Sequence, residues 1–182
     1  MPLEIAGTAI EIRRAAREDV PALLRFASIL PAHDLLFLAR DIRQVKVLDA
    51  WMAGEAAGEI VSLVATAGTE IVATSAALSD RMSWSAHVWD IRLLVSPGFR
   101  NKGIGRRLLV EAVALACAQG ARKLSAKMTP DQVGAITLFE ECGFRAEALL
   151  RNQLADDGGV LHDLAVLALE PEDQTARHDA FV

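Results

Sequence analysis

Basic residues gather in one stretch of a chain whose overall charge is acidic. The 182 residues carry a formal net charge of -5, yet residues 91–110 hold cations and no acid. Those cations are Arg92, Arg100, Lys102, Arg106 and Arg107. Gly103 and Gly105 lie among them, and glycine lets backbone N–H groups come close to a bound anion. The stretch therefore predicts a phosphate-binding loop, with an ordinary solvated basic turn as the alternative.

This loop lies between a predicted strand and a predicted helix. A short apolar run over residues 91–95 is typical of a buried strand, and Pro97-Gly98 ends it. Apolar residues then recur at helical spacing from near Gly103 onward: Ile104, Leu108, Ala112 and Leu115. Arginines at positions 106 and 107 would oppose the dipole of that helix by about 0.3–1 kcal/mol each. Their placement makes sense if an anion binds at the helix start.

Two commoner phosphate loops do not fit this pattern. A P-loop closes with Gly-Lys-Ser/Thr, but here Lys102 precedes Gly103. A dinucleotide fingerprint has a third glycine where this chain has Leu108.

Composition narrows the class of protein. The chain has 52% hydrophobic and 24% charged residues, a composition typical of a globular protein. We expect one domain over residues 10–170, followed by a flexible tail over 171–182.

The sequence also argues against several kinds of partner and cofactor. Cys117 and Cys142 lie in helical patterns without the spacing of a zinc site, so we expect no metal. The acidic balance argues against a nucleic-acid partner. No apolar run reaches the roughly 20 residues of a membrane span, and the N-terminus lacks a signal-peptide pattern, so we expect a cytoplasmic protein without a membrane partner.

Hydrophobic periodicity predicts alternating strands and helices along the domain. Strands are expected at residues 10–13, 60–66, 71–78, 88–95, 123–128, 144–154 and 160–169. Helices are expected at residues 20–30, 33–43, 45–57, 103–119 and 130–142. For the last helix, Thr129 is the expected cap, Pro130 takes the first helical position, and Gln132 completes a capping box.

Two segments resemble motifs of the GNAT superfamily of acyl-CoA-dependent N-acetyltransferases. The run Arg100-Asn101-Lys102-Gly103-Ile104-Gly105 resembles its motif A, Arg/Gln-x-x-Gly-x-Gly/Ala, and follows the usual strand end Val95-Ser96-Pro97. Residues 135–144 resemble its motif B, Ala-x-x-Leu-Tyr-x-x-x-Gly-Phe. The resemblance covers roughly residues 10–170. It implies an α/β (α+β) fold, a mixed and mostly antiparallel sheet flanked by helices in the order β-α-α-β-β-β-α-β-α-β-β, with one extra N-terminal helix.

The resemblance also implies acetyl-CoA as the acyl donor and a primary amine as the acceptor. The pantetheine arm would pair with the open edge of the central strand, where the N–H of Val95 or Leu94 would face the thioester carbonyl. A donor of this kind contributes roughly 3–4 kcal/mol in oxyanion sites. The residues expected to hold acetyl-CoA are Leu93, Leu94, Val95, Arg100, Asn101, Lys102, Gly103, Ile104, Gly105, Arg106, Gln132 and Phe139.

The sequence gives several candidates for the general base that would deprotonate the amine. Asp90 lies near where related enzymes place a carboxylate and is the candidate general base, with an ion pair to Arg92 as the structural alternative. His87 and His33 are weaker candidates for the same role. Trp84 and Trp89 could line the acceptor pocket, but a core role is favoured for both.

The general acid is missing. Phe139 occupies the usual position of the motif B tyrosine, and the chain contains no tyrosine. General acid catalysis contributes roughly 10²–10⁴-fold, so its loss slows the reaction without forbidding it. Cys142, one turn later, could face the same cleft, although core packing is favoured.

Two functions from different classes fit these observations. One is an N-acetyltransferase acting on a small molecule or a protein. The other is a non-catalytic acyl-CoA-binding module, which the missing tyrosine favours. A homodimer is compatible with either function, and the sequence does not identify the acceptor.

Overall fold

The computed structural model describes residues 3–5 and 8–171, with side chains from Ala9 onward. The predicted tail lies outside these residues, except for Pro171. The strands are β1 (Leu3–Ile5), β2 (Thr8–Arg14), β3 (Ile60–Ala67), β4 (Glu70–Leu78), β5 (Val88–Val95), β6 (Lys123–Met128), β7 (Arg145–Ala155) and β8 (Leu161–Leu169). The helices are α1 (Val20–Ile29), α2 (Val45–Ala57), α3 (Ile104–Ala118) and α4 (Val133–Glu141). The predicted order of elements is confirmed, and β1 is an additional strand that the sequence did not indicate.

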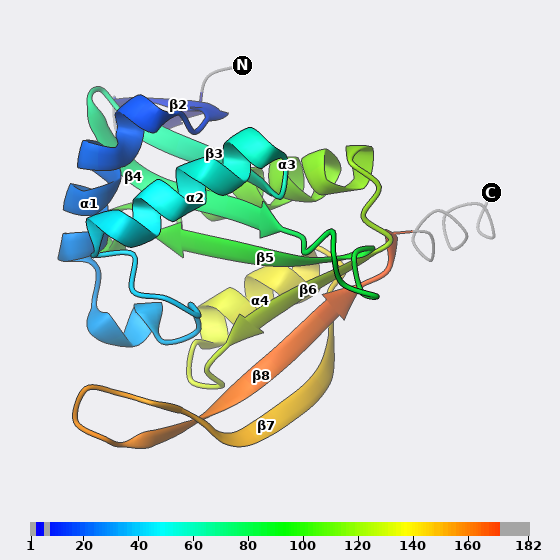
Figure 1. The fold of residues 1–182 in the computed structure, drawn as a ribbon. Helices are drawn as coiled ribbons and strands as arrows, with labels where there is room; N and C mark the ends of the chain where they lie inside the picture. Colours follow the sequence, from blue (N-terminus) through cyan, green and yellow to red (C-terminus); the bar gives the residue numbers. More distant parts are fainter. Residues whose placement is uncertain (1–2, 6–7, 172–182) are drawn as a thin grey trace.

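The described strands form one eight-stranded sheet in the order β1-β2-β3-β4-β5-β6-β8-β7 (Figure 1). Neighbouring strands are antiparallel except β5 and β6, which run parallel. That parallel pairing joins Val88–Ile91 of β5 to residues 123–126 of β6 and then stops. Beyond it the two strands diverge, and the end of β6 pairs with β8 alone. The sheet therefore opens at its centre.

Helices cover both faces of the sheet. Helices α1 and α2 lie on one face and α3 and α4 on the other (Figure 1). Each face has its own core: Leu23, Phe26 and Leu48 are buried on the α1–α2 side, and Leu109 and Phe144 on the α3–α4 side. Within the described part of the chain, none of the helices combines the length and hydrophobicity that crossing a bilayer requires.

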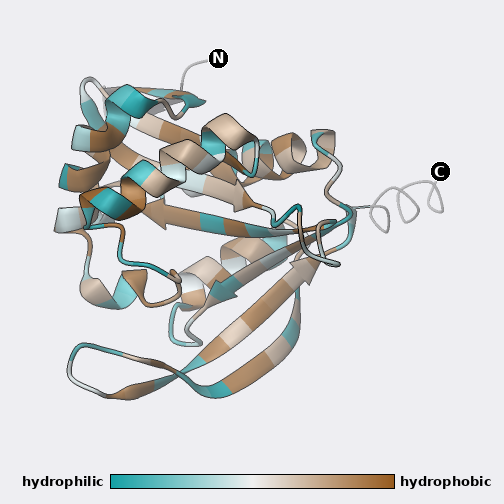
Figure 2. Ribbon diagram, viewed as in Figure 1, coloured by the Kyte–Doolittle hydropathy of each residue, from teal (hydrophilic) through white to brown (hydrophobic). Residues whose placement is uncertain are grey.

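Strand β5 contributes side chains to both faces. Trp89 and Ile91 are buried in the core under α3 and α4, which confirms the core role favoured for Trp89. Leu94 belongs to the core under α1 and α2. Asp90 and Arg92 share its face because side chains alternate along a strand. They give β5 hydrophilic bands between hydrophobic ones in Figure 2.

The prediction of a helix over residues 33–43 is wrong. A short 3₁₀ turn, Ala32–Leu35, is followed by turns up to α2. His33 and Asp34 form ion pairs with residues across the sheet opening: His33 with Asp131, and Asp34 with Arg100. Leu35 and other apolar residues pack instead into the α1–α2 core. A straight helix with one buried face cannot reach both sets of partners, so tertiary contacts override the helical periodicity.

The predicted start of the last helix is also wrong. Helix α4 begins at Val133, with Gln132 at its cap position in a non-helical conformation (φ −76°, ψ 54°). Half of the expected capping box is present, because the Thr129 N–H donates to Oε1 of Gln132 at 3.1 Å. The Thr129 hydroxyl instead lies 3.2 Å from Nε2 of His33. The side chain that should cap the helix therefore fixes the preceding loop.

Asp19 fixes the path from β2 into α1. Its carboxylate accepts two hydrogen bonds of 2.7 Å from the Arg13 guanidinium and one of 2.8 Å from the Ala16 N–H. The hydrogen bonds from Arg13 hold the pKa of Asp19 below its ordinary value of 3.8. A group of this kind stabilises the fold above its unfolded-state pKa, and the stabilisation is lost as the pH falls through the lower folded-state value.

We predict that Asp19→Asn lowers the free energy of unfolding near pH 7 by about 1–3 kcal/mol, because the paired charge of Arg13 loses its partner. Urea unfolding of wild type and variant tests this, and the difference in stability should vanish as the pH falls below the lowered pKa of Asp19. Asp49→Asn is the control, since Asp49 makes only an exposed 3.3 Å pair with Arg17. A difference that persists unchanged in acid would contradict the assignment to the carboxylate.

Candidate functional site

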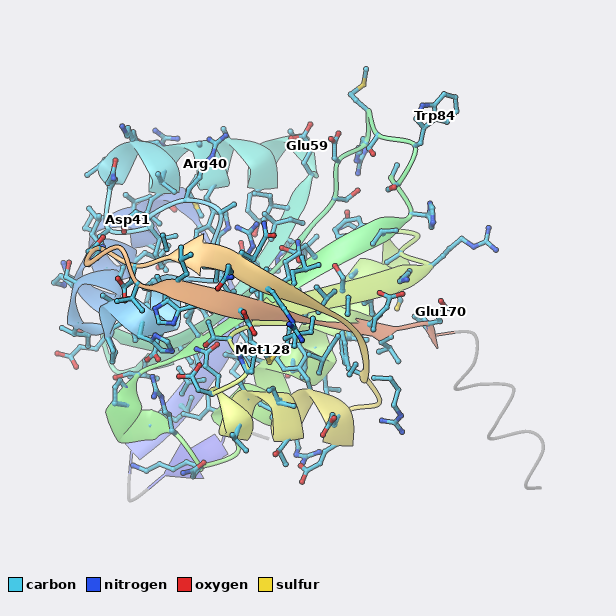
Figure 3. All side chains as sticks on the ribbon, turned by 90° about the horizontal axis from the view of Figure 1, so that it is seen from below. Arg40, Asp41, Glu59, Trp84, Met128 and Glu170 are labelled. Atoms are coloured by element: carbon cyan, nitrogen blue, oxygen red, sulfur yellow. The ribbon has the colours of Figure 1, made fainter. Side chains whose placement is uncertain are left out.

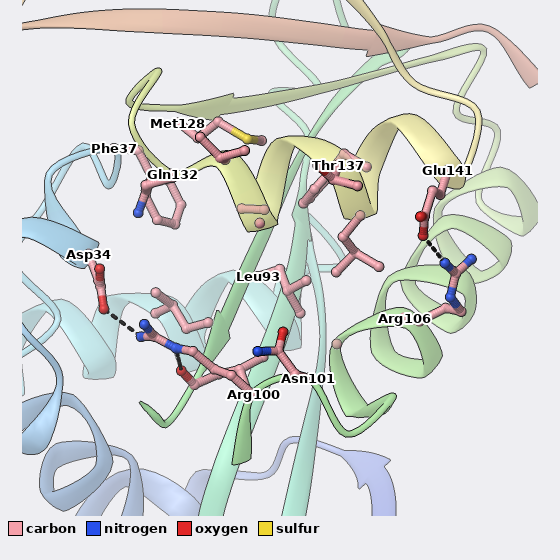
Figure 4. A pocket seen from close by; sticks show the side chains of 18 of the residues that line it. Asp34, Phe37, Leu93, Arg100, Asn101, Arg106, Met128, Gln132, Thr137 and Glu141 are labelled. Carbon is pink, nitrogen blue, oxygen red and sulfur yellow. Dashed lines mark hydrogen bonds and ion pairs between the residues drawn. The ribbon is translucent and has the colours of Figure 1, made fainter. Parts of the chain in front are cut away.

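A cleft of about 730 Å³ occupies the opening between β5 and β6. Its walls come from the end of β5, residues 99–106, the end of β6, helix α4 and residues 33–37. Figure 4 shows Leu93 of β5 between the loop that carries Arg100 and Asn101 and helix α4. The cleft thus joins a bare strand edge to the start of α3.

Backbone groups of β5 face this cleft in alternation. The Ser96 N–H donates to the Val72 carbonyl of β4 at 2.9 Å, so Val95 and Ala73 form a non-hydrogen-bonded pair. The N–H groups of Val95 and Leu93 therefore point away from β4, toward the cleft. The N–H of Leu94 points into the β4 ladder. Of the two donors that the sequence suggested, Val95 faces the cleft and Leu94 does not.

The start of α3 has no capping side chain, because its cap residue is Gly103. Gly103 adopts a left-handed conformation (φ 82°), which glycine tolerates and other residues rarely do. The first N–H groups of any helix lack intrahelical acceptors, here those of Ile104, Gly105 and Arg106. At Gly105 a Cβ would lie 3.2 Å from Cδ2 of Leu138, so glycine allows α3 to approach α4. The helix start is a concentrated set of donors beside the cleft.

The basic residues of this stretch have partners within the protein, and only the pair of Arg92 with Asp90 was indicated by the sequence. Arg100 pairs with Asp34 at 2.5 Å and donates from Nε to the Val95 carbonyl at 3.0 Å. Arg106 pairs with Glu141 of α4 (Figure 4). The remaining pairs are Arg92 with Asp90, Arg107 with Glu111, and Lys102 with the Gly98 carbonyl. Carboxylates, two of them from distant segments, therefore offset much of the charge that the sequence assigned to a bound anion.

Asp90 lies where β5 and β6 part, on the face covered by α1 and α2. Its carboxylate accepts a 3.0 Å bond from Nε of Arg92, and its other oxygen lies 3.3 Å from Nζ of Lys127 and 3.4 Å from the Ser125 hydroxyl. The ion pair proposed as the structural alternative is present. The Asp90 side chain is 21% exposed, but this residue is not among those that line the cleft.

Phe139 and Gln132 both line the cleft. The Phe139 residue is only 3% exposed, and its ring packs edge-on against Phe144 with centroids 5.0 Å apart. The Gln132 side chain is engaged with the Thr129 N–H. The cleft therefore meets a phenyl ring where the motif B tyrosine is expected.

The other candidates divide between the cleft and the surface. His33 lines the cleft and lies 2.7 Å from Asp131, whose pKa is lowered by hydrogen bonds from Thr129 and by His33. Trp84 is fully exposed on the loop before β5, so the core role favoured for it is wrong (Figure 3). His87, also on that loop, lies outside the lining of the cleft.

The two cysteines are partly buried and pack against the core under α3 and α4, as favoured from the sequence. Burial raises the pKa of the Cys142 thiol, which keeps it protonated. Among the described residues, no group of three or more His, Cys, Asp or Glu side chains is arranged to hold a metal ion.

A second cavity of about 290 Å³, here called the α2 cavity, lies on the face covered by α1 and α2. Residues 38–42, helix α2 and strands β3–β5 line it. Leu94 lines both the α2 cavity and the cleft. The sequence did not predict this cavity, because its walls come from segments that are far apart along the chain.

The family model for the acetyltransferase (GNAT) family matches residues 29–144, which span both motifs and the cleft. The chain belongs to the GNAT acetyltransferase family. Curated protein sequences give no match to this chain.

Solved structures share the GNAT fold at low sequence identity. A GNAT-family acetyltransferase from Streptococcus pneumoniae is 20% identical, with a TM-score of 0.76 over 88% of this chain and 99% of that one. An N-acetyltransferase from Staphylococcus aureus Mu50 is 21% identical, with a TM-score of 0.77 over 88% and 98%. The yncA protein of Salmonella typhimurium, solved with its cofactor acetyl-CoA, is 20% identical, with a TM-score of 0.76 over 88% and 93%.

We predict that Gly103→Asp abolishes acetyl-CoA binding measured by calorimetry, because it places a negative charge and a side chain at the bare start of α3. Gly120→Asp is the matched control. Gly120 also has a positive φ and open space around its Cα, but it lies just beyond the other end of α3. The control adds the same charge and a similar backbone strain, so equal affinity of the two variants would refute the assignment of the anion site.

Proposed function

We propose that the protein is an N-acetyltransferase that moves an acetyl group from acetyl-CoA to a primary amine. The observation that carries this proposal is the presence of two sets of backbone donors at the cleft. One consists of the open N–H groups of Leu93 and Val95, and the other is the uncapped start of α3. The two sets suit a molecule with an extended amide chain at one end and phosphates at the other.

The loop and helix start would hold the phosphates. The N–H groups of Gly103, Ile104, Gly105 and Arg106 supply donors, aided by the positive end of the helix dipole. Lys102 and Asn101 flank them, while Arg100 and Arg106 would share their guanidinium groups between phosphate and their carboxylate partners. Backbone donors therefore matter more in this proposal than unpaired charge.

The open edge of β5 would hold the pantetheine arm and the thioester. An amide chain lying along residues 93–95 pairs with the edge as an added strand does. Leu93 is nearest to the point where β5 and β6 part, so a thioester seated deepest in the cleft meets the Leu93 N–H, with Val95 next along the arm. In oxyanion sites, one such donor is worth about 3–4 kcal/mol of transition-state stabilisation.

The reaction needs proton transfers as well as binding. The amine nitrogen attacks the thioester carbon, a C–N bond forms and the C–S bond breaks. Of the two protons that an ammonium nitrogen loses, one goes to the departing sulfur and the other to solvent. Asp90 would accept the proton that goes to solvent, directly or through a water, and then release it. The sulfur would take its proton without a tyrosine, which slows but does not prevent departure of a thiol whose pKa is roughly 8.5.

A non-catalytic acyl-CoA-binding module remains the second candidate function. The observation that favours it is Phe139, which puts a buried apolar ring at the usual general-acid position. Both functions require acetyl-CoA to bind, so release of CoA with an amine separates them. A protein that binds acetyl-CoA and releases no thiol with amino acids, polyamines, aminoglycosides or peptides is a binding module.

We predict that Asp90→Asn lowers kcat at neutral pH by about 10²-fold or more, since the amide cannot accept the proton. Acetyl-CoA affinity should stay the same, because Asp90 is not among the residues that line the cleft. Ser125→Ala is the control, as it removes one hydrogen bond to Asp90 and leaves the carboxylate. Thiol release and the melting temperature are measured together. A variant that loses stability but keeps its kcat would assign Asp90 to structure alone.

We predict that Phe139→Tyr raises turnover at neutral pH, by up to about 10²-fold, because it restores a proton donor beside the sulfur. The gain should fade as the pH approaches about 10, where the phenol ionises. The measurement is CoA release against pH for wild type and variant with one accepted amine. A variant no faster than wild type at neutral pH would show that another group or a water already supplies the proton.

A further inference from the structure

The α2 cavity has an apolar body and an entirely basic set of charges. Its walls include Leu38, Leu78, Leu94 and Trp51, and the indole of Trp51 is held by a 2.9 Å hydrogen bond from Nε1 to the Ser62 hydroxyl. Among the described residues that line it, the charged ones are two arginines, Arg40 and Arg92, with no acid. A cavity of about 290 Å³ suits a small molecule of roughly amino-acid size.

The two arginines differ in what they already bind. Arg92 donates from Nε to Asp90, so part of its charge is offset. Arg40 is exposed and has no hydrogen bond or ion pair to any residue that the structure describes. An unpaired guanidinium at the rim of an apolar cavity is a recognition group for a carboxylate, which it can bind through two parallel hydrogen bonds.

The position of the cavity connects it to the reaction. Leu94 lies in its wall and in the wall of the cleft, and Leu93, whose N–H faces the cleft, is the next residue along β5. Successive residues of a strand are about 3.3 Å apart. Asp90 lines neither cavity, but its carboxylate accepts a hydrogen bond from Arg92, which lies in the wall of the α2 cavity. That wall is therefore in contact with the proposed general base.

From this arrangement we infer that the acceptor is a small aliphatic amino acid, whose apolar part fills the α2 cavity and whose carboxylate binds Arg40. The inference rests on the proposed function and specifies its substrate class. The amine attacks the thioester carbon as described above, with loss of two protons, one to the sulfur and one to solvent. The carboxylate takes no part in the chemistry and determines which amines bind.

Other amines match the cavity less well. A polyamine would bring several positive charges to a cavity whose charged residues are arginines. A peptide N-terminus lacks a free carboxylate within its first residue and leaves Arg40 unpaired. A simple alkylamine fills the apolar part, but its ammonium group is repelled by Arg92 and Arg40, and the molecule carries no anion to offset this repulsion.

The test uses pairs of amines that differ in the carboxylate alone. Thiol release by the wild-type chain is compared for leucine and leucinamide, and for 6-aminohexanoate and 6-aminohexanamide. The first pair places the carboxylate beside the amine and the second places it at the far end of an apolar chain. We expect kcat/KM for the acid to exceed that for the amide at least about tenfold in one pair, the usual effect of a charged hydrogen bond.

Arg40→Gln should remove this preference by raising KM for the acid while leaving the amide unchanged. Arg25→Gln is the matched control, because Arg25 is likewise exposed, lacks a described partner and lines neither cavity. Equal kcat/KM for acid and amide in both pairs, or a preference that survives Arg40→Gln, overturns the inference.

Failure of the proposed function gives a different result. If acetyl-CoA binds and no amine releases thiol, the catalytic role fails, and the same four compounds are then titrated by calorimetry. Binding of an acid that is lost in Arg40→Gln and kept in Arg25→Gln would still support an amino-acid site in the α2 cavity. Absence of any binding would overturn it.

Discussion

The parting of β5 and β6 is the constraint on which the rest of the structure depends. Parallel pairing ends at Ile91 and Ala126, and the next N–H groups of β5 have no strand beside them. Buried backbone groups left without partners are costly, so an opening in the middle of a sheet persists only when surrounding contacts hold it. Here β8 takes up the end of β6, and β4 remains paired with β5 up to Val95.

Ion pairs from distant segments hold the two sides of this opening. Asp34 reaches Arg100 from the turn region before α2, and Glu141 reaches Arg106 from α4. His33 and Asp131 join the same turn region to the loop before α4. These partly exposed pairs contribute little individually to stability, but together they fix the loop, the turn region and α4 around one space.

Much of the fold could be predicted from local patterns. The strand at 88–95, the loop glycines and the helix after them follow from an apolar run, a Pro-Gly stop and helical spacing, all of which are local. The helix expected at 33–43 has the same local signal and is absent, because His33 and Asp34 have partners far away in the sequence. Local periodicity carries no information about such contacts, and here they determine the backbone conformation of the segment.

The candidate site divides in the same way. The motif A residues and Phe139 are consecutive or regularly spaced, and most of them line the cleft; Lys102 does not, and the Ile104 side chain is buried in the core. Asp34 and Glu141 were missed, because no spacing relates them to the loop. The α2 cavity was missed for the same reason. Its unpaired Arg40 is one of many exposed arginines until the fold places it at a cavity rim.

The Arg100–Asp34 pair connects the basic loop of the cleft to the segment that contributes to the wall of the α2 cavity. Arg100 has one guanidinium, held by Asp34 and by the Val95 carbonyl, and it lies where the donor's phosphates would approach. Residues 38–42, which contribute to the wall of the α2 cavity, begin four residues after Asp34. A phosphate that shared the Arg100 guanidinium would weaken its bond to Asp34, and a ligand that fixed the turn region would hold Asp34 against Arg100. Thermodynamic reciprocity would then require each ligand to change the other's affinity by the same factor, through this one ion pair.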